Sequence, residues 1–274
     1  MNTYAPIGIF DSGYGGLTIL AEIKKRLPQY DYLYLGDNAR SPYGTRSFDV
    51  VYEYTLEAVN ELFSRGCELV ILACNTASAK ALRTIQQQDL PKIDTNKRVL
   101  GVIRPSAEEL GSITKTGNVG ILATEGTVRS ESYVLELDKY APNVNVFQQA
   151  CPMWVPIIEN QKHQTKAGKL FIQEDVQALL SQHPNMDTLL LGCTHYPIIE
   201  SYIASIVGPE VRVIAQGPIV AQKLDEYLKR HPELEQLCSK SGDVTYLTTE
   251  NKEVFNRKAS HFLGEPVTSI HVKI

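Results

Sequence analysis

The sequence contains few cysteines, and their spacing gives no pairing pattern. Only five cysteines occur in 274 residues, an odd number at wide and irregular intervals. Small proteins that depend on disulfides usually carry a dense and even set. Neither a C-x-x-C nor an H-x-x-x-H spacing occurs, so no zinc motif is recognisable. We therefore expect a fold held by its hydrophobic core, with neither a disulfide framework nor a metal site.

Excess positive charge and long apolar runs are also missing. Lysine and arginine number 27 against 31 aspartates and glutamates, for a formal net charge of −4. Because binding to phosphate backbones depends on positive charge, we expect no nucleic-acid partner. No uncharged apolar run approaches the roughly 18 residues of a membrane-spanning helix. The first residues lack the basic segment of a signal peptide. These absences predict a soluble, cytoplasmic protein with no membrane partner.

Short β-branched segments alternate with longer helical patterns along the whole chain. Several of these segments are continuously apolar, which is typical of strands buried on both faces of a parallel sheet. The alternation of strands and helices predicts an α/β protein. The expected strands are Ile7–Phe10, Tyr32–Leu35, Leu69–Ala73, Val99–Val102, Val119–Ala123, Val144–Phe147, Thr188–Leu191, Val211–Ile214 and Val244–Leu247.

Two helices have clear end signals. One is expected to follow Ser47, a good N-cap residue, and to reach Arg65 before Gly66 permits a left-handed helix end. The other is expected over residues 253–263 and ends at Gly264, with Pro266 beyond it.

The chain resembles itself at two places. IGIFDSGYGG at Ile7 is similar to VGILATEGTV at Val119, and LVILACNTAS is similar to the later LLLGCTHYP. Two such units in the same order predict a duplicated half. The alternative is that any two α/β segments share this level of similarity, but the recurrence of a cysteine at the same point favours duplication.

Cys74 and Cys193 each follow a fully apolar segment and precede polar residues, in ACNT and GCTH. Ligands of open α/β sheets bind beyond the carboxyl ends of the strands, so we expect both thiols to lie in such a crevice. Backbone N–H groups at a helix start there stabilise a thiolate. A single cysteine at a strand end is more often a small buried apolar residue. Two in matching contexts favour a chemical role.

Two thiols that face one carbon from opposite sides suit a proton-transfer reaction. One thiolate removes a proton from one face while the other thiol delivers a proton to the opposite face. A Cys–His hydrolase with Cys193 as nucleophile stays an alternative, and it would need only one thiol. A protein that binds a dicarboxylate without catalysis is another alternative.

Six motifs, in order along nearly the whole chain, resemble the glutamate racemase family of the aspartate/glutamate racemase superfamily. They are IGIFDSGYGGLT at Ile7, YLGDNARSPYGTRS at Tyr34, ILACNTASA at Ile71, ATEGTVRS at Ala123, ACPMWVPIIE at Ala150 and LLGCTHYP at Leu190. Aspartate and hydantoin racemases share the two-cysteine plan but match the middle motifs less well. An aspartate or other amino-acid racemase therefore stays an alternative.

The resemblance implies two related, pseudo-duplicated α/β domains with mainly parallel sheets and an active site at their interface. The expected domains are residues 1–97 plus 210–274 and residues 98–209, with crossings near Val99 and Pro209. It also implies an isomerase that converts L-glutamate to D-glutamate without a cofactor such as pyridoxal phosphate. D-glutamate would serve peptidoglycan synthesis, cell wall biogenesis and cell shape. Glutamate is the expected small-molecule partner, and a homodimer the expected assembly.

The resemblance also implies roles for residues at matching positions. Cys74 and Cys193 are the expected catalytic acid and base. Asp11 is expected near Cys74 and the substrate ammonium, and Glu159 is expected to orient His195, which assists Cys193. The residues expected to bind substrate are Asp11, Ser12, Tyr43 and Gly44 (through hydroxyl and main chain), Asn75, Thr76, Thr124, Thr127, Thr194 and His195. Apart from the resemblance, each of the polar residues after a strand also fits an ordinary helix N-cap.

The sequence departs from the family pattern at a few positions. Asn38 and Ser41 stand where Thr and Val are common, and Ala215 stands where an aspartate is usual. None of these positions is assigned to the chemistry, but Ala215 is expected to affect the joint between the domains. The chain begins six residues before Ile7. We therefore expect no N-terminal extension of the kind that carries regulation by a cell-wall precursor in some family members.

Overall fold

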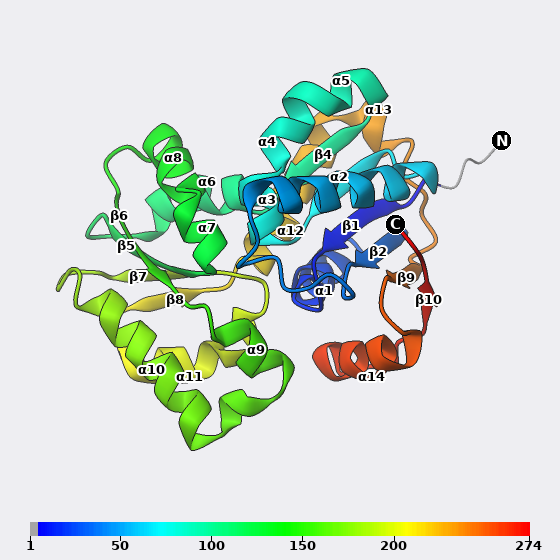
Figure 1. Ribbon diagram of the computed structural model, residues 1–274. Helices are drawn as coiled ribbons and strands as arrows, with labels where there is room; N and C mark the ends of the chain where they lie inside the picture. Colours follow the sequence, from blue (N-terminus) through cyan, green and yellow to red (C-terminus); the bar gives the residue numbers. More distant parts are fainter. Residues whose placement is uncertain (1–4) are drawn as a thin grey trace.

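Two parallel sheets organise residues 5–274, which are the residues that the computed structural model describes (Figure 1). The strands are β1 (Ile7–Asp11), β2 (Tyr32–Gly36), β3 (Leu69–Leu72), β4 (Arg98–Gly101), β5 (Asn118–Ala123), β6 (Asn145–Ala150), β7 (Thr188–Gly192), β8 (Arg212–Ile214), β9 (Val244–Thr248) and β10 (Ser269–His271). The six-stranded sheet has the order β10-β9-β2-β1-β3-β4, and the four-stranded sheet has the order β6-β5-β7-β8. Every neighbouring pair is parallel. The α/β prediction is confirmed.

The helices that precede β6 are α1 (Gly16–Arg26), α2 (Phe48–Ser64), α3 (Asn75–Lys80), α4 (Leu82–Thr84), the π-helical η1 (Ile85–Asp89), α5 (Leu90–Ile93), α6 (Ile103–Ile113), α7 (Glu125–Arg129) and α8 (Ser132–Tyr140). Those that follow β6 are α9 (Trp154–Glu159), the 3₁₀ turn η2 (Lys162–Gln164), α10 (Lys166–Leu180), the 3₁₀ turn η3 (Tyr196–Ile199), α11 (Glu200–Val207), α12 (Gly217–Arg230), α13 (Pro232–Glu235) and α14 (Lys252–Leu263).

The two sheets repeat one strand order. In the first sheet β2-β1-β3-β4 are neighbours in that order, and in the second β6-β5-β7-β8 follow the same scheme. β1 therefore corresponds to β5, and β3 corresponds to β7, as the internal similarity of the sequence predicts. β9 and β10 extend the first sheet beyond β2. The prediction of two related, pseudo-duplicated units is confirmed at the level of topology.

The sequence prediction missed β10 and displaced several strand ends. β10 has three residues, too few to show a hydrophobic pattern, and it lies at the edge of the sheet. The expected strand at Val144–Phe147 runs instead from Asn145 to Ala150. Val102 is the residue before α6 and not the end of a strand.

Strand pairing also shows where the chain passes between the sheets. β4 pairs with β3 in the first sheet, and β8 pairs with β7 in the second. The chain therefore crosses from the first sheet to the second after Gly101 and returns after Ile214. Both crossings lie a few residues later than those expected near Val99 and Pro209. Residues 98–101 and 210–214 lie on the other side of the expected boundaries. The division into domains of residues 1–97 plus 210–274 and 98–209 otherwise stays a prediction.

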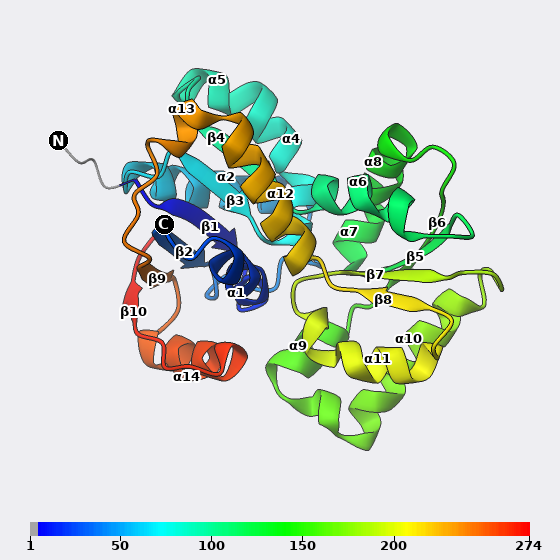
Figure 2. The same ribbon diagram turned by 180° about the vertical axis from the view of Figure 1, so that it is seen from behind.

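Helices cover both faces of each sheet (Figures 1 and 2). Ile7 and Ile9 of β1 pack with α1, α12 and α14, whereas Phe10 of the same strand packs with α2 on the opposite face. In the four-stranded sheet, α6 and α8 cover one face and α9, α10 and α11 cover the other. Burial on both faces explains why the strands are continuously apolar in the sequence.

The two predicted helix ends are confirmed. Ser47 caps α2, where its hydroxyl accepts a hydrogen bond from the Val50 N–H at 3.4 Å. Gly66 and Gly264 follow α2 and α14 with φ of 95° and 71°, in the left-handed region that glycine adopts without strain. Within residues 5–274, no helix is long and apolar enough to cross a membrane.

Asp187 joins the loop between α6 and β5 to the start of β7. Its carboxylate accepts hydrogen bonds from the Thr114 hydroxyl at 2.6 Å and from the backbone N–H groups of Lys115 and Thr116 at 2.6 and 2.9 Å. Burial opposes ionisation, but these hydrogen bonds prevail and lower the pKa of Asp187 to about 2.

The low pKa of Asp187 predicts how stability depends on pH. Its ionised form stabilises the fold fully above the ordinary pKa of 3.8, and this stabilisation is lost as the pH falls toward 2. We expect Asp187→Asn to lower the free energy of unfolding by roughly 1–2 kcal/mol at pH 7. The loss should shrink toward pH 2.5 in urea unfolding experiments. The same substitution at the exposed Asp138 serves as the control. An equal loss of unfolding free energy from Asp187→Asn at pH 7 and at pH 2.5 would contradict the prediction.

Candidate active site

Residues that follow six strands line one cavity of about 90 Å³. They come from the ends of β1, β2 and β3 in one sheet and of β5, β6 and β7 in the other. The carboxyl ends of both sheets therefore meet at one place, as the rule for open α/β sheets predicts. The predicted residues that line the cavity are Ser12, Tyr43, Gly44, Cys74, Asn75, Thr76, Thr124, Cys193, Thr194 and His195.

Cys74 lies between β3 and α3, at the N-cap of the helix. Its backbone is extended, and its Sγ accepts a hydrogen bond from the Ala77 N–H at 3.5 Å. The Ser12 hydroxyl lies 3.4 Å from the same sulfur. Burial, reinforced by the nearby Asp11 carboxylate, nevertheless raises the pKa of the Cys74 thiol to about 12. Cys74 is therefore a protonated thiol at neutral pH.

Cys193 follows β7 and has a different environment. The His195 Nδ1 lies 3.9 Å from its sulfur, and the His195 Nε2 lies 2.9 Å from Glu159 Oε1 at the end of α9. Burial alone would lower the pKa of His195, but its hydrogen bonds to Cys193 and Glu159 and the charges of both partners raise it to about 10. His195 is therefore an imidazolium at neutral pH, and its hydrogen bond to Glu159 holds it beside the Cys193 sulfur. The expected contact between Glu159 and His195 is present.

Asp11 ends β1 and is completely buried behind the cavity. Its Oδ2 accepts a hydrogen bond from the Gly16 N–H at 3.1 Å, while its Oδ1 has no partner among the described residues. Burial raises the pKa of Asp11 to about 6, and the charge of His195 limits the rise. The structure thus holds a carboxylate oxygen ready to accept a hydrogen bond from a cationic group.

Neutral donors surround the rest of the cavity. The hydroxyls of Thr76 and Thr124, one from each half, lie 2.9 Å apart. Glu125 also lines the cavity, but its carboxylate faces Arg129 at 3.7 Å. Within residues 5–274, no lysine or arginine lines the cavity. An anionic ligand would therefore bind through hydroxyl, amide and backbone N–H groups.

Two of the predicted binding residues have other partners. The Tyr43 hydroxyl donates its one hydrogen to Asp37 Oδ2, so the expected hydroxyl contact to a ligand carboxylate would need this bond to change, and it stays a prediction. Thr127 does not line the cavity, and its hydroxyl lies 3.0 Å from that of Thr124. In both cases the fold brings a hydrogen-bond partner close to the hydroxyl. A sequence motif does not show which partner that will be.

Sequence reasoning missed several residues around the cavity. Cys151 lines the cavity directly after β6, although the sequence analysis singled out only Cys74 and Cys193. Its position after a strand, like that of Cys193, was the available signal. Burial keeps it a thiol, because it raises the pKa of Cys151 well above the ordinary value. The other missed lining residues are Ser41, Pro42, Thr45, Glu125, Pro152, Val155 and Pro156.

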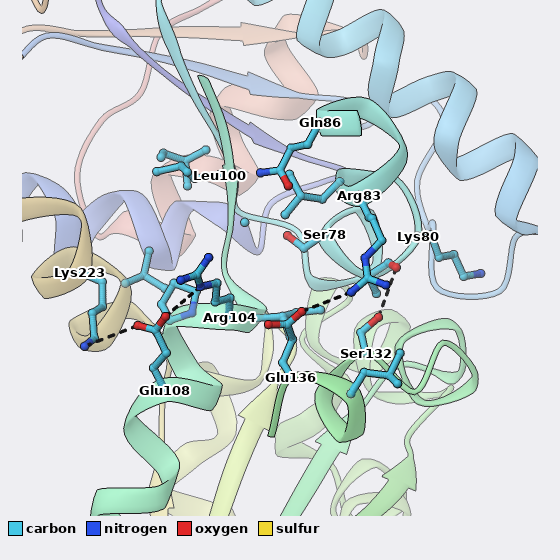
Figure 3. A pocket seen from close by; sticks show the side chains of 18 of the residues that line it. Ser78, Lys80, Arg83, Gln86, Leu100, Arg104, Glu108, Ser132, Glu136 and Lys223 are labelled. Carbon is cyan, nitrogen blue, oxygen red and sulfur yellow. Dashed lines mark hydrogen bonds and ion pairs between the residues drawn. The ribbon is translucent and has the colours of Figure 1, made fainter. Parts of the chain in front are cut away.

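A larger cavity of about 780 Å³ lies elsewhere at the joint, among α3, α4, α6, α8 and α12 (Figure 3). None of the predicted site residues lines it. Several of its charged side chains pair with one another: Arg83 lies 3.7 Å from Glu136, and Lys223 lies 3.8 Å from Glu108. We therefore place the candidate active site at the smaller cavity, which holds both predicted cysteines.

The two halves touch closely beside the smaller cavity. The Thr18 hydroxyl of α1 donates to the Thr194 carbonyl at 2.9 Å. Gly15 precedes α1, and a Cβ built there would lie 2.3 Å from Thr194 Oγ1 and 2.4 Å from His195 Nδ1. Only glycine allows this approach of the first half to the loop that carries Cys193.

The chain is similar to known proteins over nearly its whole length. Residues 17–224 match the family described as Asp/Glu/Hydantoin racemase. A glutamate racemase of Ruegeria sp. (strain TM1040) is 41% identical over 272 residues, covering 96% of this chain and 98% of that protein. The structure of glutamate racemase isoform RacE1 from Bacillus anthracis has a TM-score of 0.90 at 31% identity, covering 99% of this chain and 98% of that one. The glutamate racemase of Francisella tularensis, solved in complex with D-glutamate, has a TM-score of 0.83 at 30% identity, covering 100% and 98%.

The close contact at Gly15 predicts the effect of a single added methyl group. The φ and ψ of Gly15 (−60° and −38°) suit alanine, so any loss of stability from Gly15→Ala must come from crowding. We expect a loss of about 1–3 kcal/mol in the free energy of unfolding. The halves should also separate locally, so Cys74 and Cys193 should react faster with a thiol reagent. Gly13→Ala is the control for the free energy of unfolding, because its Cβ would meet only the ends of two polar side chains at 3.2–3.3 Å. Wild-type stability and thiol reactivity in Gly15→Ala would contradict the prediction.

Proposed function

This chain belongs to the Asp/Glu/hydantoin racemase family, and we propose that Cys74 and Cys193 exchange the proton at Cα of glutamate. Its activity is glutamate racemisation, the interconversion of the L and D forms, as in its full-length relatives. The observation that carries the proposed mechanism is the placement of both thiols, one from each half, on the wall of one cavity.

The proposed reaction has two balanced proton transfers. A cysteine thiolate takes the Cα proton, so that an S–H bond forms while the C–H bond breaks and its electron pair stays on the substrate. Hydrogen bonds to the substrate carboxylate stabilise the negative charge that develops there. The thiol on the opposite side then gives up its proton, and a new C–H bond forms with inverted configuration. Each turnover exchanges the protonation states of the two cysteines.

The two thiols have different surroundings. Burial and the Asp11 carboxylate raise the pKa of Cys74 to about 12, whereas Cys193 has the His195 Nδ1 at 3.9 Å from its sulfur. For each substrate enantiomer, one cysteine acts as the base and the other as the acid. For the opposite substrate enantiomer the roles reverse, and the substrate ammonium supplies positive charge near Cys74 and Asp11.

The polar groups of the cavity suit an amino acid with two carboxylates. The free Asp11 Oδ1 accepts from the ammonium, while Ser12, Asn75, Thr76, Thr124 and Thr194, together with the backbone of Tyr43 and Gly44, donate to the carboxylates. Neutral donors leave the cavity without fixed positive charge beyond His195. The choice of glutamate over aspartate rests on the relatives, including the one solved with D-glutamate.

D-glutamate is a component of peptidoglycan, so the activity supplies cell wall synthesis. The mechanism requires both cysteines as free thiols, and all five cysteines are free in the structure. Thiols stay reduced in the cytoplasm, which is therefore the expected location. A homodimer stays a prediction.

Substitution of each cysteine tests the two-thiol mechanism. We expect Cys74→Ser and Cys193→Ser each to lower kcat in both directions by about 10²–10⁴-fold, because serine is a much poorer acid and base in each role. Polarimetry of L- and D-glutamate checks this, and wild-type product formed in D₂O should carry deuterium at Cα. Cys238→Ser, in the first half and outside the cavity, should keep full activity. Full activity in Cys74→Ser would end the two-thiol mechanism and favour a Cys193 nucleophile.

The raised pKa of Asp11 predicts an acid limit of activity. Asp11 loses its charge as the pH falls through about 6, and its attraction for the substrate ammonium is then lost. The value of kcat/KM should therefore fall below about pH 6 in the wild type. Asp11→Asn should lack this limb and have at least tenfold lower kcat/KM at pH 8.

A stability measurement separates this role of Asp11 from a structural one. A carboxyl group whose folded pKa lies above its ordinary value destabilises the fold when it is ionised. Asp11→Asn should therefore unfold at a Tm no lower than that of the wild type at pH 7. If Asp11→Asn lowers the Tm and its kcat/KM still falls below about pH 6, the acid limb comes from another group.

A further inference from the structure

A ring of three buried side chains lies next to the active-site cavity. Asn75 Nδ2 donates to Gln216 Oε1 at 2.7 Å, and Gln216 Nε2 donates to the Tyr133 hydroxyl at 2.7 Å. The Tyr133 hydroxyl completes the ring by donating to Asn75 Oδ1 at 2.7 Å. All three side chains are at most 2% exposed. Unmade hydrogen bonds at this depth are costly, so the ring is strongly held.

Gln216 sits where both passages of the chain between the sheets come together. It precedes α12, directly after the return from β8, and its Nε2 also lies 3.2 Å from the carbonyl of Val102 at the first passage. A further bond of 2.8 Å runs from Nε2 to the Ser106 hydroxyl on α6. Asn75 belongs to α3 of the first half, and Tyr133 belongs to α8 of the second. The Gln216 side chain therefore connects the segments that cross between the sheets to a helix of each half.

The Val102 carbonyl sets the direction of the hydrogen bonds in this ring. A carbonyl only accepts, so the Gln216 atom that lies 3.2 Å from it is Nε2 and not Oε1. Ser106 donates to the same carbonyl at 2.9 Å, so the hydroxyls of Ser106 and Tyr133 both accept from Gln216 Nε2, and the Tyr133 hydrogen goes to Asn75. The two short bonds use both Nε2 hydrogens of Gln216. The orientation of the Asn75 amide is fixed as a result, with Oδ1 toward Tyr133 and Nδ2 toward Gln216.

This orientation leaves Asn75 with one N–H hydrogen that no described residue accepts. Asn75 lines the active-site cavity and directly follows Cys74. Because the Asn75 side chain is already fixed, its N–H group binds a carboxylate with little further loss of conformational entropy. Without the ring, the Asn75 amide would be free to turn over and present its oxygen to the ligand.

We propose that Gln216 is a positioning residue for the racemase, which acts through Asn75 to aim an N–H group at the substrate carboxylate. The inference rests on the proposed function, because it names a determinant of substrate binding at the same site. Gln216 does not line the cavity and touches no reacting atom. Ala215, which immediately precedes it, has no polar side chain. Gln216 therefore supplies the side-chain hydrogen bonds where the chain returns from β8.

The test replaces Gln216 by methionine, which is similar in length but neither donates nor accepts strongly. We expect Gln216→Met to raise KM for both glutamate enantiomers about tenfold, the effect of weakening one hydrogen bond to a charged group. The kcat at saturation should stay within about threefold, because neither thiol is touched. Gln222→Met, on the exposed side of α12, is the matched control and should leave both values unchanged.

A double-substitution cycle distinguishes positioning from a general structural role. If Gln216 acts through Asn75, then Gln216→Met adds nothing to the KM of Asn75→Ala. A structural role instead lowers Tm and the active fraction while leaving KM unchanged, or multiplies the two KM effects. Either of these results overturns the inference.

Tyr133→Phe keeps the inference testable if Gln216→Met does not fold. It removes one hydroxyl of the ring and should raise KM two- to fivefold, again only when Asn75 is present. An unchanged KM in this variant overturns the inference. If the wild type itself does not racemise glutamate, the proposed function fails. If the wild type racemises glutamate but the variants keep its KM, only the role of Gln216 is rejected.

Discussion

Burial of ionisable groups is the constraint on which the site depends. Asp11, Cys74 and His195 are all shielded from water, so burial opposes the charge on each of them. The polar and charged groups nearest to each of these three side chains then decide whether it is ionised. His195, which is hydrogen-bonded to Glu159, lies beside Cys193, whereas the Asp11 carboxylate lies near Cys74 and reinforces the rise of its pKa. The two thiols therefore have different electrostatic surroundings, and the proposed proton transfer needs one of them as base and the other as acid.

The repeated strand order explains why the site has two thiols. β3 and β7 hold equivalent places in their sheets, and a cysteine follows each of them. Because the carboxyl ends of both sheets line one cavity, residues at equivalent positions of the two sheets line the same cavity. The surroundings have diverged: Cys74 caps a helix beside Ser12, whereas Cys193 has an imidazole neighbour. The repeated strand order thus accounts for the pair of thiols, and the residues around them account for their different surroundings.

Polar contacts hold the two halves together beside the cavity. Gly15 allows the first half to approach the Cys193 loop, and the hydroxyls of Thr76 and Thr124, one from each half, are in contact. Gln216 accepts a hydrogen bond from Asn75 and donates one to the Val102 carbonyl. Hydrogen bonds have directional requirements that apolar contacts lack, so this joint favours one relative placement of the halves. The positions of the two thiols follow from that placement.

The sequence by itself determined the class of fold, the strand–helix alternation, the duplication and the two cysteines, because local hydrophobic patterns and motif order carry this information. The resemblance supplied Asp11, His195 and Glu159, and the structure brings them to the cysteines. Only the tertiary structure decided that the Tyr43 hydroxyl bonds Asp37, that Thr127 lies behind Thr124, and that Cys151 reaches the cavity. The same holds for Gln216, Tyr133 and Asn75, which lie far apart in the chain. Hydrogen-bond partners and burial arise from packing between distant segments, and no local pattern encodes which segments will meet.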